Sequence, residues 1–211
     1  MRLTIGKSPS WILTASIAFI VLLSLQSYTE DTRSRIGNVV SDFSLPCVSG
    51  KNSSLSDYPD AKGFIIVFTC NHCPFAKLYP ARLNALSTKY QSLHVPLLAI
   101  SSTDTTLYEE DSFDRMKAKA SAEHFTFPYL FDGDQQVARQ FYAQKTPHAF
   151  VLWKEKGQWV VKYDGAIDDN GAEPTKVKAS YVALAVDALL NGKSVAVKET
   201  KSIGCQIHFK K

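Results

Sequence analysis

Two cysteines separated by two residues are the feature of this 211-residue sequence that most directly indicates chemistry. Cys70 and Cys73 follow the apolar run Phe64–Thr69, and Pro74 comes directly after them. This spacing keeps the two sulfur atoms close enough for a disulfide to form and break between them. A strand over the apolar run and a helix starting at Cys73 would place free N–H groups near the thiolate and stabilise it. The pair therefore predicts a site for thiol–disulfide exchange.

The positions of the two cysteines predict separate roles. We expect Cys70, at the end of the strand, to be the exposed nucleophile whose thiolate attacks a target disulfide. Cys73 would then attack Cys70 and release the target. His72 lies between them, and a positive charge there would favour the thiolate of Cys70. We therefore predict that the pKa of Cys70 lies below that of a free cysteine, which would make the pair more oxidising.

Metal-based uses of the same cysteines fit the sequence less well. Covalent haem attachment needs a histidine directly after the second cysteine, where Pro74 stands. A structural zinc site usually takes two cysteine pairs, whereas Cys47 and Cys205 are solitary. A copper carrier remains an alternative, because thiolates select Cu(I) and His72 or His148 could join the pair as a ligand. In the main interpretation we expect no metal and no cofactor.

The two solitary cysteines leave three interpretations open. A disulfide between Cys47 and Cys205 would join the two ends of the domain. Alternatively, Cys205 acts as an auxiliary redox thiol beside the main pair. In the third interpretation neither residue has a role in the chemistry.

The elements that must position the dithiol follow an α/β order. The run Phe64–Thr69 is apolar without alternation, as expected for a strand covered on both faces. A helix is expected over Cys73–Tyr90 with a kink at Pro80, and His148–Trp153 with Trp159–Tyr163 forms the clearest hairpin. The remaining expected elements are strands at Val95–Ile100 and Tyr129–Phe131, helices at Glu109–Glu123, Gln135–Tyr142 and Val177–Leu190, and an N-terminal hairpin of Val39–Leu45 with Ser53–Leu55. This order predicts a mixed sheet flanked by helices, with the hairpin as an N-terminal extension.

The first 27 residues differ in kind from the rest of the chain. Arg2 and Lys7 precede the uncharged stretch Trp11–Leu25, a pattern typical of an export signal. A basic start before a short apolar stretch keeps the N-terminus inside and carries the following chain across the membrane. We interpret residues 1–27 as a signal peptide or an uncleaved N-terminal membrane anchor.

The rest of the chain then divides into a linker over residues 28–38 and one domain over residues 39–211. We expect this domain to be periplasmic or otherwise extracytoplasmic. If the first segment stays uncleaved, its apolar stretch over residues 11–28 is close to the minimum for a bilayer span and would tether the domain to the inner membrane.

Composition and charge fit an ordinary soluble domain. The chain is 45% hydrophobic and 21% charged, and its net charge of +4 comes from scattered basic residues. The final Lys210 and Lys211 are too short a run to act as a polybasic arm. We therefore expect no nucleic-acid partner.

Several short segments occur together in an order that is specific to one group of proteins. They are Phe68–Phe75, Tyr108–Phe113, Phe127–Leu130, Thr146–Pro147, Gly165–Asn170 and Gly204–Ile207. In them the sequence resembles the thioredoxin fold, and more narrowly the peroxiredoxin-like group of the redoxin (AhpC/TSA) superfamily. The resemblance covers about Val39–Lys211 and implies a thioredoxin-like sheet, a redox-active Cys70/Cys73 pair and a cis bond before Pro147.

Thr146 and Pro147 supply the second half of the site in this interpretation. A cis bond at Pro147 would turn the chain sharply beside the dithiol and expose backbone groups that can pair with a substrate strand.

The peroxidase motif of the superfamily is out of register here. Typical peroxiredoxins carry Pro-x-x-x-Thr-x-x-Cys, but three and seven places before Cys73 stand Cys70 and Ile66, and before Cys70 stand Val67 and Gly63. Cys73 aligns with the peroxidatic position, yet its neighbour Cys70 would divert oxidation into a local disulfide. We therefore expect thiol–disulfide exchange with protein thiols and disulfides. An upstream redox partner would return the cysteine pair to its starting redox state. Peroxide reduction is the alternative activity.

Overall fold

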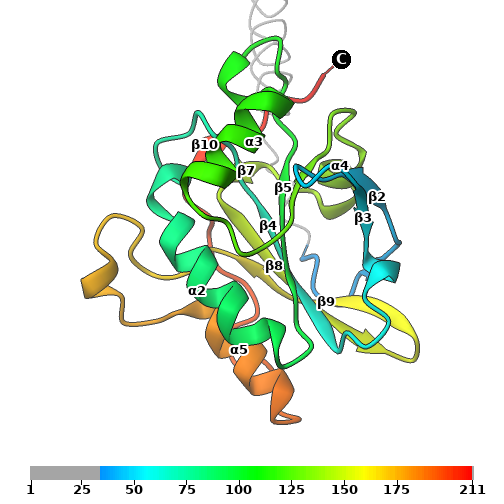
Figure 1. Cartoon of the computed structure of the whole chain (residues 1–211). Coiled ribbons are helices and arrows are strands. Elements are labelled where there is room, and N and C mark those ends of the chain that lie inside the picture. Colours follow the sequence, from blue (N-terminus) through cyan, green and yellow to red (C-terminus); the bar gives the residue numbers. More distant parts are fainter. Residues whose placement is uncertain (1–33, 211) are drawn as a thin grey trace, which may run out of the picture. The chain divides into compact units, whose positions relative to one another are not determined.

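The computed structural model describes residues 34–210 (Figure 1). The predicted signal peptide or anchor, residues 1–27, lies outside this range together with residues 28–33 of the linker. Across the part of the chain that is described, no helix has both the length and the apolar character needed to cross a bilayer. The folded unit that holds the dithiol begins at Arg35.

A six-stranded mixed sheet forms the centre of this unit, with the strand order β1-β9-β8-β4-β5-β6. The strands are β1 (Val39–Val40), β4 (Gly63–Phe68), β5 (Leu97–Ser101), β6 (Tyr129–Phe131), β8 (His148–Glu155) and β9 (Gln158–Gly165). β4, β5 and β6 run parallel, whereas β8 pairs antiparallel with both β4 and β9. This arrangement confirms the predicted mixed sheet and its β8–β9 hairpin.

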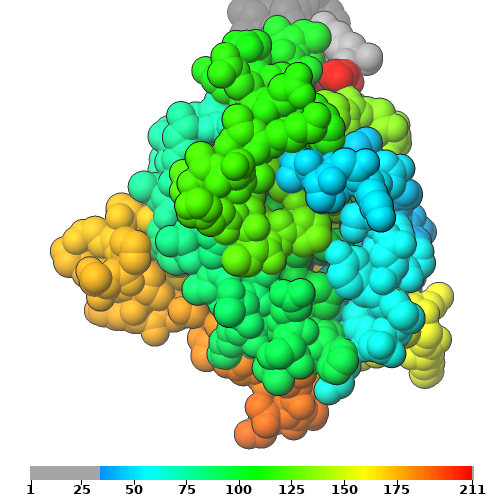
Figure 2. All heavy atoms as spheres, in the orientation of Figure 1, coloured from blue at the N-terminus to red at the C-terminus, as the bar shows by residue number. Residues whose placement is uncertain are grey.

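Helices cover both faces of the sheet. The α-helices are α2 (Pro80–Gln91), α3 (Phe113–Ala122), α4 (Gln136–Phe141) and α5 (Tyr181–Leu190). Short 3-10 helices are η1 (Leu55–Asp57), η2 (Ala76–Leu78), η3 (Glu109–Asp111) and η4 (Pro174–Lys176). In Figure 1, α2 and α5 lie side by side, and they contribute to the same core cluster. The segment around η4 projects from the surface, as Figure 2 shows.

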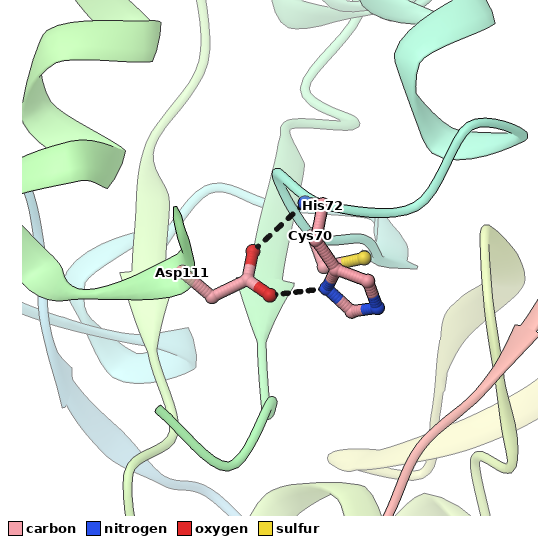
Figure 3. A group of neighbouring side chains, drawn as sticks. All are labelled: Cys70, His72 and Asp111. Atoms are coloured by element: carbon pink, nitrogen blue, oxygen red, sulfur yellow. Dashed lines mark hydrogen bonds and ion pairs between the residues drawn. The ribbon is translucent and has the colours of Figure 1, made fainter. Parts of the chain in front are cut away.

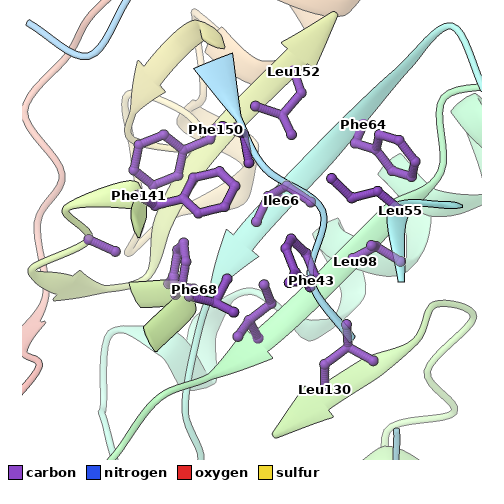
Figure 4. Close-up of a cluster of buried hydrophobic side chains, with 14 of the residues drawn as sticks. Phe43, Leu55, Phe64, Ile66, Phe68, Leu98, Leu130, Phe141, Phe150 and Leu152 are labelled. Atoms are coloured by element: carbon purple, nitrogen blue, oxygen red, sulfur yellow. The ribbon is translucent and has the colours of Figure 1, made fainter. Parts of the chain in front are cut away.

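The side chains of β4 alternate between two cores. Phe64, Ile66 and Phe68 pack with α4 and the N-terminal hairpin (Figure 4), whereas Ile65 and Val67 pack with α2, α3 and α5. All five residues have no exposed surface. Burial on both faces explains why the sequence of this strand is apolar throughout. It also makes β4 a rigid support for the residues that follow it.

The predicted N-terminal hairpin is present, with one difference. β2 (Ser44–Pro46) and β3 (Asn52–Ser54) form a separate two-stranded antiparallel sheet. Val39–Val40, which we expected in the same hairpin, instead pairs with β9 as the edge strand β1 of the main sheet.

The prediction of a single kinked helix over Cys73–Tyr90 is wrong. Pro80 occupies the first turn of α2, where its missing N–H would have had no helical partner. The residues before it form the separate turn η2, so Cys73 lies ahead of the helical residues. Pro80 therefore starts the helix rather than bending it.

The end of the chain returns to the dithiol. β10 (Cys205–Gln206) pairs antiparallel with β7 (Lys145–Thr146) in a small second sheet. Because β7 ends immediately before Pro147, this pairing brings the C-terminal segment to the second half of the predicted site.

Candidate active site

The two cysteines lie where the central strand β4 ends. Cys70 follows β4 after one residue, and Cys73 occupies the turn before η2. Phe68 of β4 pairs with His148 of β8. The Thr146–Pro147 bond, which immediately precedes β8, therefore lies beside the cysteines.

Thr146 contacts both sulfur atoms. Its hydroxyl oxygen is 3.1 Å from Cys70 Sγ, and its carbonyl oxygen is 3.1 Å from Cys73 Sγ. The peptide bond between Thr146 and Pro147 is cis, as the resemblance implied. Four of the predicted site residues, Cys70, Cys73, Thr146 and Pro147, thus come together at one place.

Cys73 is surrounded by hydrogen-bond donors. Its sulfur accepts from the thiols of Cys70 and Cys205 and from the backbone N–H groups of Ala76 and Cys205, the last at 3.4 Å. The hydrogen bond from Cys70 contributes most, and together the donors lower the pKa of Cys73 to about 4 against the opposing effect of burial. The Thr146 carbonyl is an acceptor for the neutral thiol, but these donors outnumber it. Cys73 therefore carries the thiolate of the reduced site.

Cys70 has the opposite character, which corrects the sequence-based prediction. The hydrogen bond that Cys70 donates to Cys73 raises the pKa of Cys70, and burial and the Asp111 carboxylate raise it further. Its exposed fraction is 0%. The prediction of an exposed, acidic Cys70 is therefore wrong, because the donors of this turn gather around Cys73 instead.

His72 lies beside the pair but is held by a buried acid. Its Nδ1 bonds to the carboxylate of Asp111, a residue of η3 with no exposed surface (Figure 3). The other carboxylate oxygen accepts from the backbone N–H of Asn71 and, at 3.3 Å, from that of His72. The imidazole also stacks on Tyr108, with ring centroids 3.9 Å apart. The negative partner of His72 opposes the thiolate stabilisation that we had assigned to this histidine.

Asp111 is the residue that sequence reasoning missed. The Cys-x-x-Cys spacing gives no sign of a buried acid beside the pair, whereas the structure supplies one from η3. The available signal was the segment Tyr108–Phe113, which belongs to the resemblance but had no role attached. Asn71 fixes the same loop, since it donates to the Glu110 carbonyl at 2.7 Å and accepts from the Tyr129 hydroxyl at 3.0 Å.

The remaining two cysteines lie in different surroundings. Cys205 packs against Cys70, Cys73 and Ala76, whereas Cys47 is buried in the core cluster with α4 and forms a β-bridge with Leu130. The structure therefore does not join Cys47 to Cys205, and it places Cys205 at the dithiol.

The ligands considered for copper are only partly brought together. Potential ligand atoms of Cys70, His72 and Asp111 lie within 4.8 Å of one another. His148 instead pairs through Nε2 with Asp164 at 2.5 Å. A carboxylate suits Cu(I) poorly, so this trio fits a copper carrier less well than a set of thiolates would.

An apolar cavity of about 390 Å³ adjoins the site. Phe75, Leu78, Pro147 and Ile203 are among its lining residues. Phe75, Leu78 and Ile203 are exposed, so a partner that reaches the dithiol meets an apolar surface first.

Comparison with known proteins finds similar sequences and structures that cover most of this chain. The thiol-disulfide oxidoreductase ResA of Geobacillus kaustophilus (strain HTA426) is 26% identical over 153 residues, which is 72% of this chain and 82% of that protein. A solved structure of an uncharacterized conserved protein from Geobacillus kaustophilus is 34% identical, with a TM-score of 0.77 and coverage of 85% of this chain and 94% of the other.

A third comparison concerns the fold. The crystal structure of peroxidoxin BcpB from Mycobacterium tuberculosis superposes with a TM-score of 0.52 at 19% identity, covering 75% of this chain and 96% of that one. Fold and site together define an oxidoreductase with a thioredoxin-like fold. Residues 36–170 match the model of the AhpC/TSA family, and the chain belongs to that family.

The lowered pKa of Cys73 predicts a pH-dependent stability of the reduced protein. A thiolate favoured in the folded state contributes stability that is complete above the ordinary thiol pKa of 9.0 and is lost as the pH falls through about 4. The difference in unfolding free energy between the wild type and Cys73→Ser should therefore grow as the pH rises from 4 toward 9. Denaturant titrations under reducing conditions measure it. Parallel pH profiles for the two proteins would contradict the assignment.

Removal of the Asp111 charge should lower the pKa of Cys70. The effect is cleanest in a Cys73→Ser background, where the coupling between the two thiols is gone. Asp111→Asn keeps an acceptor for the Asn71 N–H but removes the charge that opposes ionisation of Cys70. Ultraviolet absorbance of the thiolate against pH measures the shift. The matched control is Glu110→Gln, which removes a charge from the exposed residue next to Asp111. Equal pKa values of Cys70 in the two variants would refute the role of Asp111.

Proposed function

We propose that this protein is an extracytoplasmic thiol–disulfide oxidoreductase that exchanges disulfides with protein partners through Cys70 and Cys73. The observation that carries the proposal is the pair of cysteine sulfurs beyond the end of β4, each held 3.1 Å from an oxygen of Thr146. Disulfide exchange requires a thiolate that attacks and a neighbouring thiol that resolves the mixed disulfide. The similarity to ResA supports the same chemistry.

The exchange balances with these two residues. The Cys73 thiolate attacks one sulfur of a partner disulfide, the partner's S–S bond breaks, and its other sulfur leaves as a thiolate. Cys70 then attacks the Cys73 sulfur, the bond between Cys73 and the partner breaks, the Cys70 proton passes to one of the partner's two thiolates, and a Cys70–Cys73 disulfide remains. The partner is reduced and the protein oxidised, and the reverse sequence oxidises a partner dithiol.

The N-terminal sequence supports the compartment. Residues 1–27 have the basic start and apolar stretch of an export signal or anchor, and disulfide chemistry persists in oxidising compartments outside the cytoplasm. In this proposal an upstream redox partner returns the dithiol to its working state.

Peroxide reduction is the second candidate, because the Cys73 thiolate also has the ionisation that attack on a peroxide needs. The copper carrier is the third, and it makes no use of the hydrogen bond between the two thiols.

Exchange with a protein disulfide tests the main proposal. With the full-length protein, Cys70→Ser and Cys73→Ser should each slow reduction of a protein disulfide such as that of insulin by at least about 100-fold. Cys47→Ser is the control, since Cys47 lies in a separate core cluster, and its rate should match the wild type.

Two further measurements separate the alternatives. Hydrogen peroxide consumption that exceeds disulfide exchange would favour a peroxidase, and stoichiometric Cu(I) binding without exchange would favour a carrier. Wild-type exchange in Cys73→Ser would overturn the proposed function itself.

A further inference from the structure

The C-terminal segment closes the dithiol off from solvent. Cys70 and Cys73 each have an exposed fraction of 0%, whereas Cys205 is half-buried. The covering strand is β10, in which Cys205 pairs with Thr146 and Gln206 with Lys145. An external sulfur atom therefore meets Cys205 before it can meet either residue of the pair.

The backbone around Cys205 is fitted closely to the site. A Cβ atom on Gly204 would lie 2.0 Å from the Thr146 carbonyl oxygen, so glycine is needed for this approach. Beyond β10, the Ile207 N–H donates to the Gln144 carbonyl at 2.8 Å. The segment thus occupies the edge before Pro147, where an incoming partner strand would pair by β-strand addition. The position of a partner cysteine is taken by Cys205.

The chemistry at Cys205 follows the charge on Cys73. Burial, the hydrogen bond to the Cys73 thiolate and the charge of that thiolate together raise the pKa of Cys205 to about 11. Both contributions from Cys73 vanish when Cys73 enters a disulfide. Cys205 is therefore a weak nucleophile beside the reduced pair and a stronger one beside the oxidised pair.

We propose that Cys205 is a third redox thiol, which takes the disulfide over from Cys70 and presents it to the partner as Cys73–Cys205. The proposal rests on the proposed function and replaces direct reaction of Cys73 with the partner by reaction at Cys205.

The transfer balances as two successive exchanges. The Cys205 thiolate, its proton released to water, attacks Cys73 in the Cys70–Cys73 disulfide. That bond breaks, Cys73–Cys205 forms, and Cys70 leaves and takes up a proton. A partner thiolate then attacks the Cys205 sulfur, and Cys73 leaves as a thiolate.

The second thiol of the partner completes the reaction. It attacks the partner sulfur of the mixed disulfide, and Cys205 is released and protonated. The partner dithiol has become a disulfide, and the protein has gained the two electrons. The same steps in reverse reduce a partner disulfide.

Two properties direct the partner to Cys205 rather than to Cys73. Cys205 is the more exposed sulfur of the proposed disulfide. Cys73 is the better leaving group, because a thiol of low pKa leaves faster.

Disulfide mapping in the full-length Cys70→Ser variant tests the proposal. In this variant Cys73 cannot form a disulfide with residue 70. After oxidation with oxidised glutathione and removal of the oxidant, mass spectrometry should find Cys73 linked to Cys205. Cys73 found without that link would overturn the proposal. This variant keeps both cysteines in question, so the result does not depend on how well a Cys205 variant folds.

Kinetics of Cys205→Ser supply the second arm. Exchange with a protein partner should fall at least about tenfold, while exchange of the same variant with the small molecule glutathione falls less. Cys47→Ser is again the matched control. A wild-type rate with protein partners for Cys205→Ser, with Cys73→Ser inactive, would refute the role of Cys205 and leave the proposed function standing. Wild-type exchange in Cys73→Ser would instead refute the proposed function.

Discussion

The hydrogen bond from the Cys70 thiol to the Cys73 sulfur is the interaction on which the site depends. It makes the largest contribution to ionisation of Cys73, and it holds the proton of Cys70 in place. Thr146 keeps both sulfurs in position, with contacts of 3.1 Å to each. Because β4 is buried on both faces, the loop that carries the pair starts from a fixed point. The sheet therefore fixes the positions of the two cysteine sulfur atoms relative to each other.

The groups around this pair affect the ionisation of the two thiols in opposite directions. Asp111 lies on the side of Cys70 and opposes its ionisation, while the N–H groups of Ala76 and Cys205 favour ionisation of Cys73. His72 belongs to the Asp111 side, through its ring nitrogen and its backbone N–H. The hydrogen bond to the Cys73 thiolate, together with burial and the Asp111 carboxylate, keeps Cys70 protonated until Cys73 has reacted, which orders the two steps of exchange.

The local sequence was enough to predict the framework of this site. An apolar run without alternation identifies β4, the Cys-x-x-Cys spacing identifies the dithiol, and the resemblance supplies the cis bond at Pro147. Which thiol ionises depends on Asp111 and Cys205, which are remote in sequence and reach the pair only through η3 and β10. Spacing within Cys70–Cys73 carries no information about them, and the assumption of a helix at Cys73 led to the wrong thiolate.

In the reduced protein, Cys73 and not Cys70 is the thiolate. Nuclear magnetic resonance of protein labelled with ¹³C at cysteine Cβ can distinguish the two residues, because each thiol reports its own titration. We expect the Cβ signal of Cys73 to titrate near pH 4 and Cys70 to stay protonated through neutral pH. An acidic titration that belongs to Cys70, with Cys73 protonated at neutral pH, would contradict it.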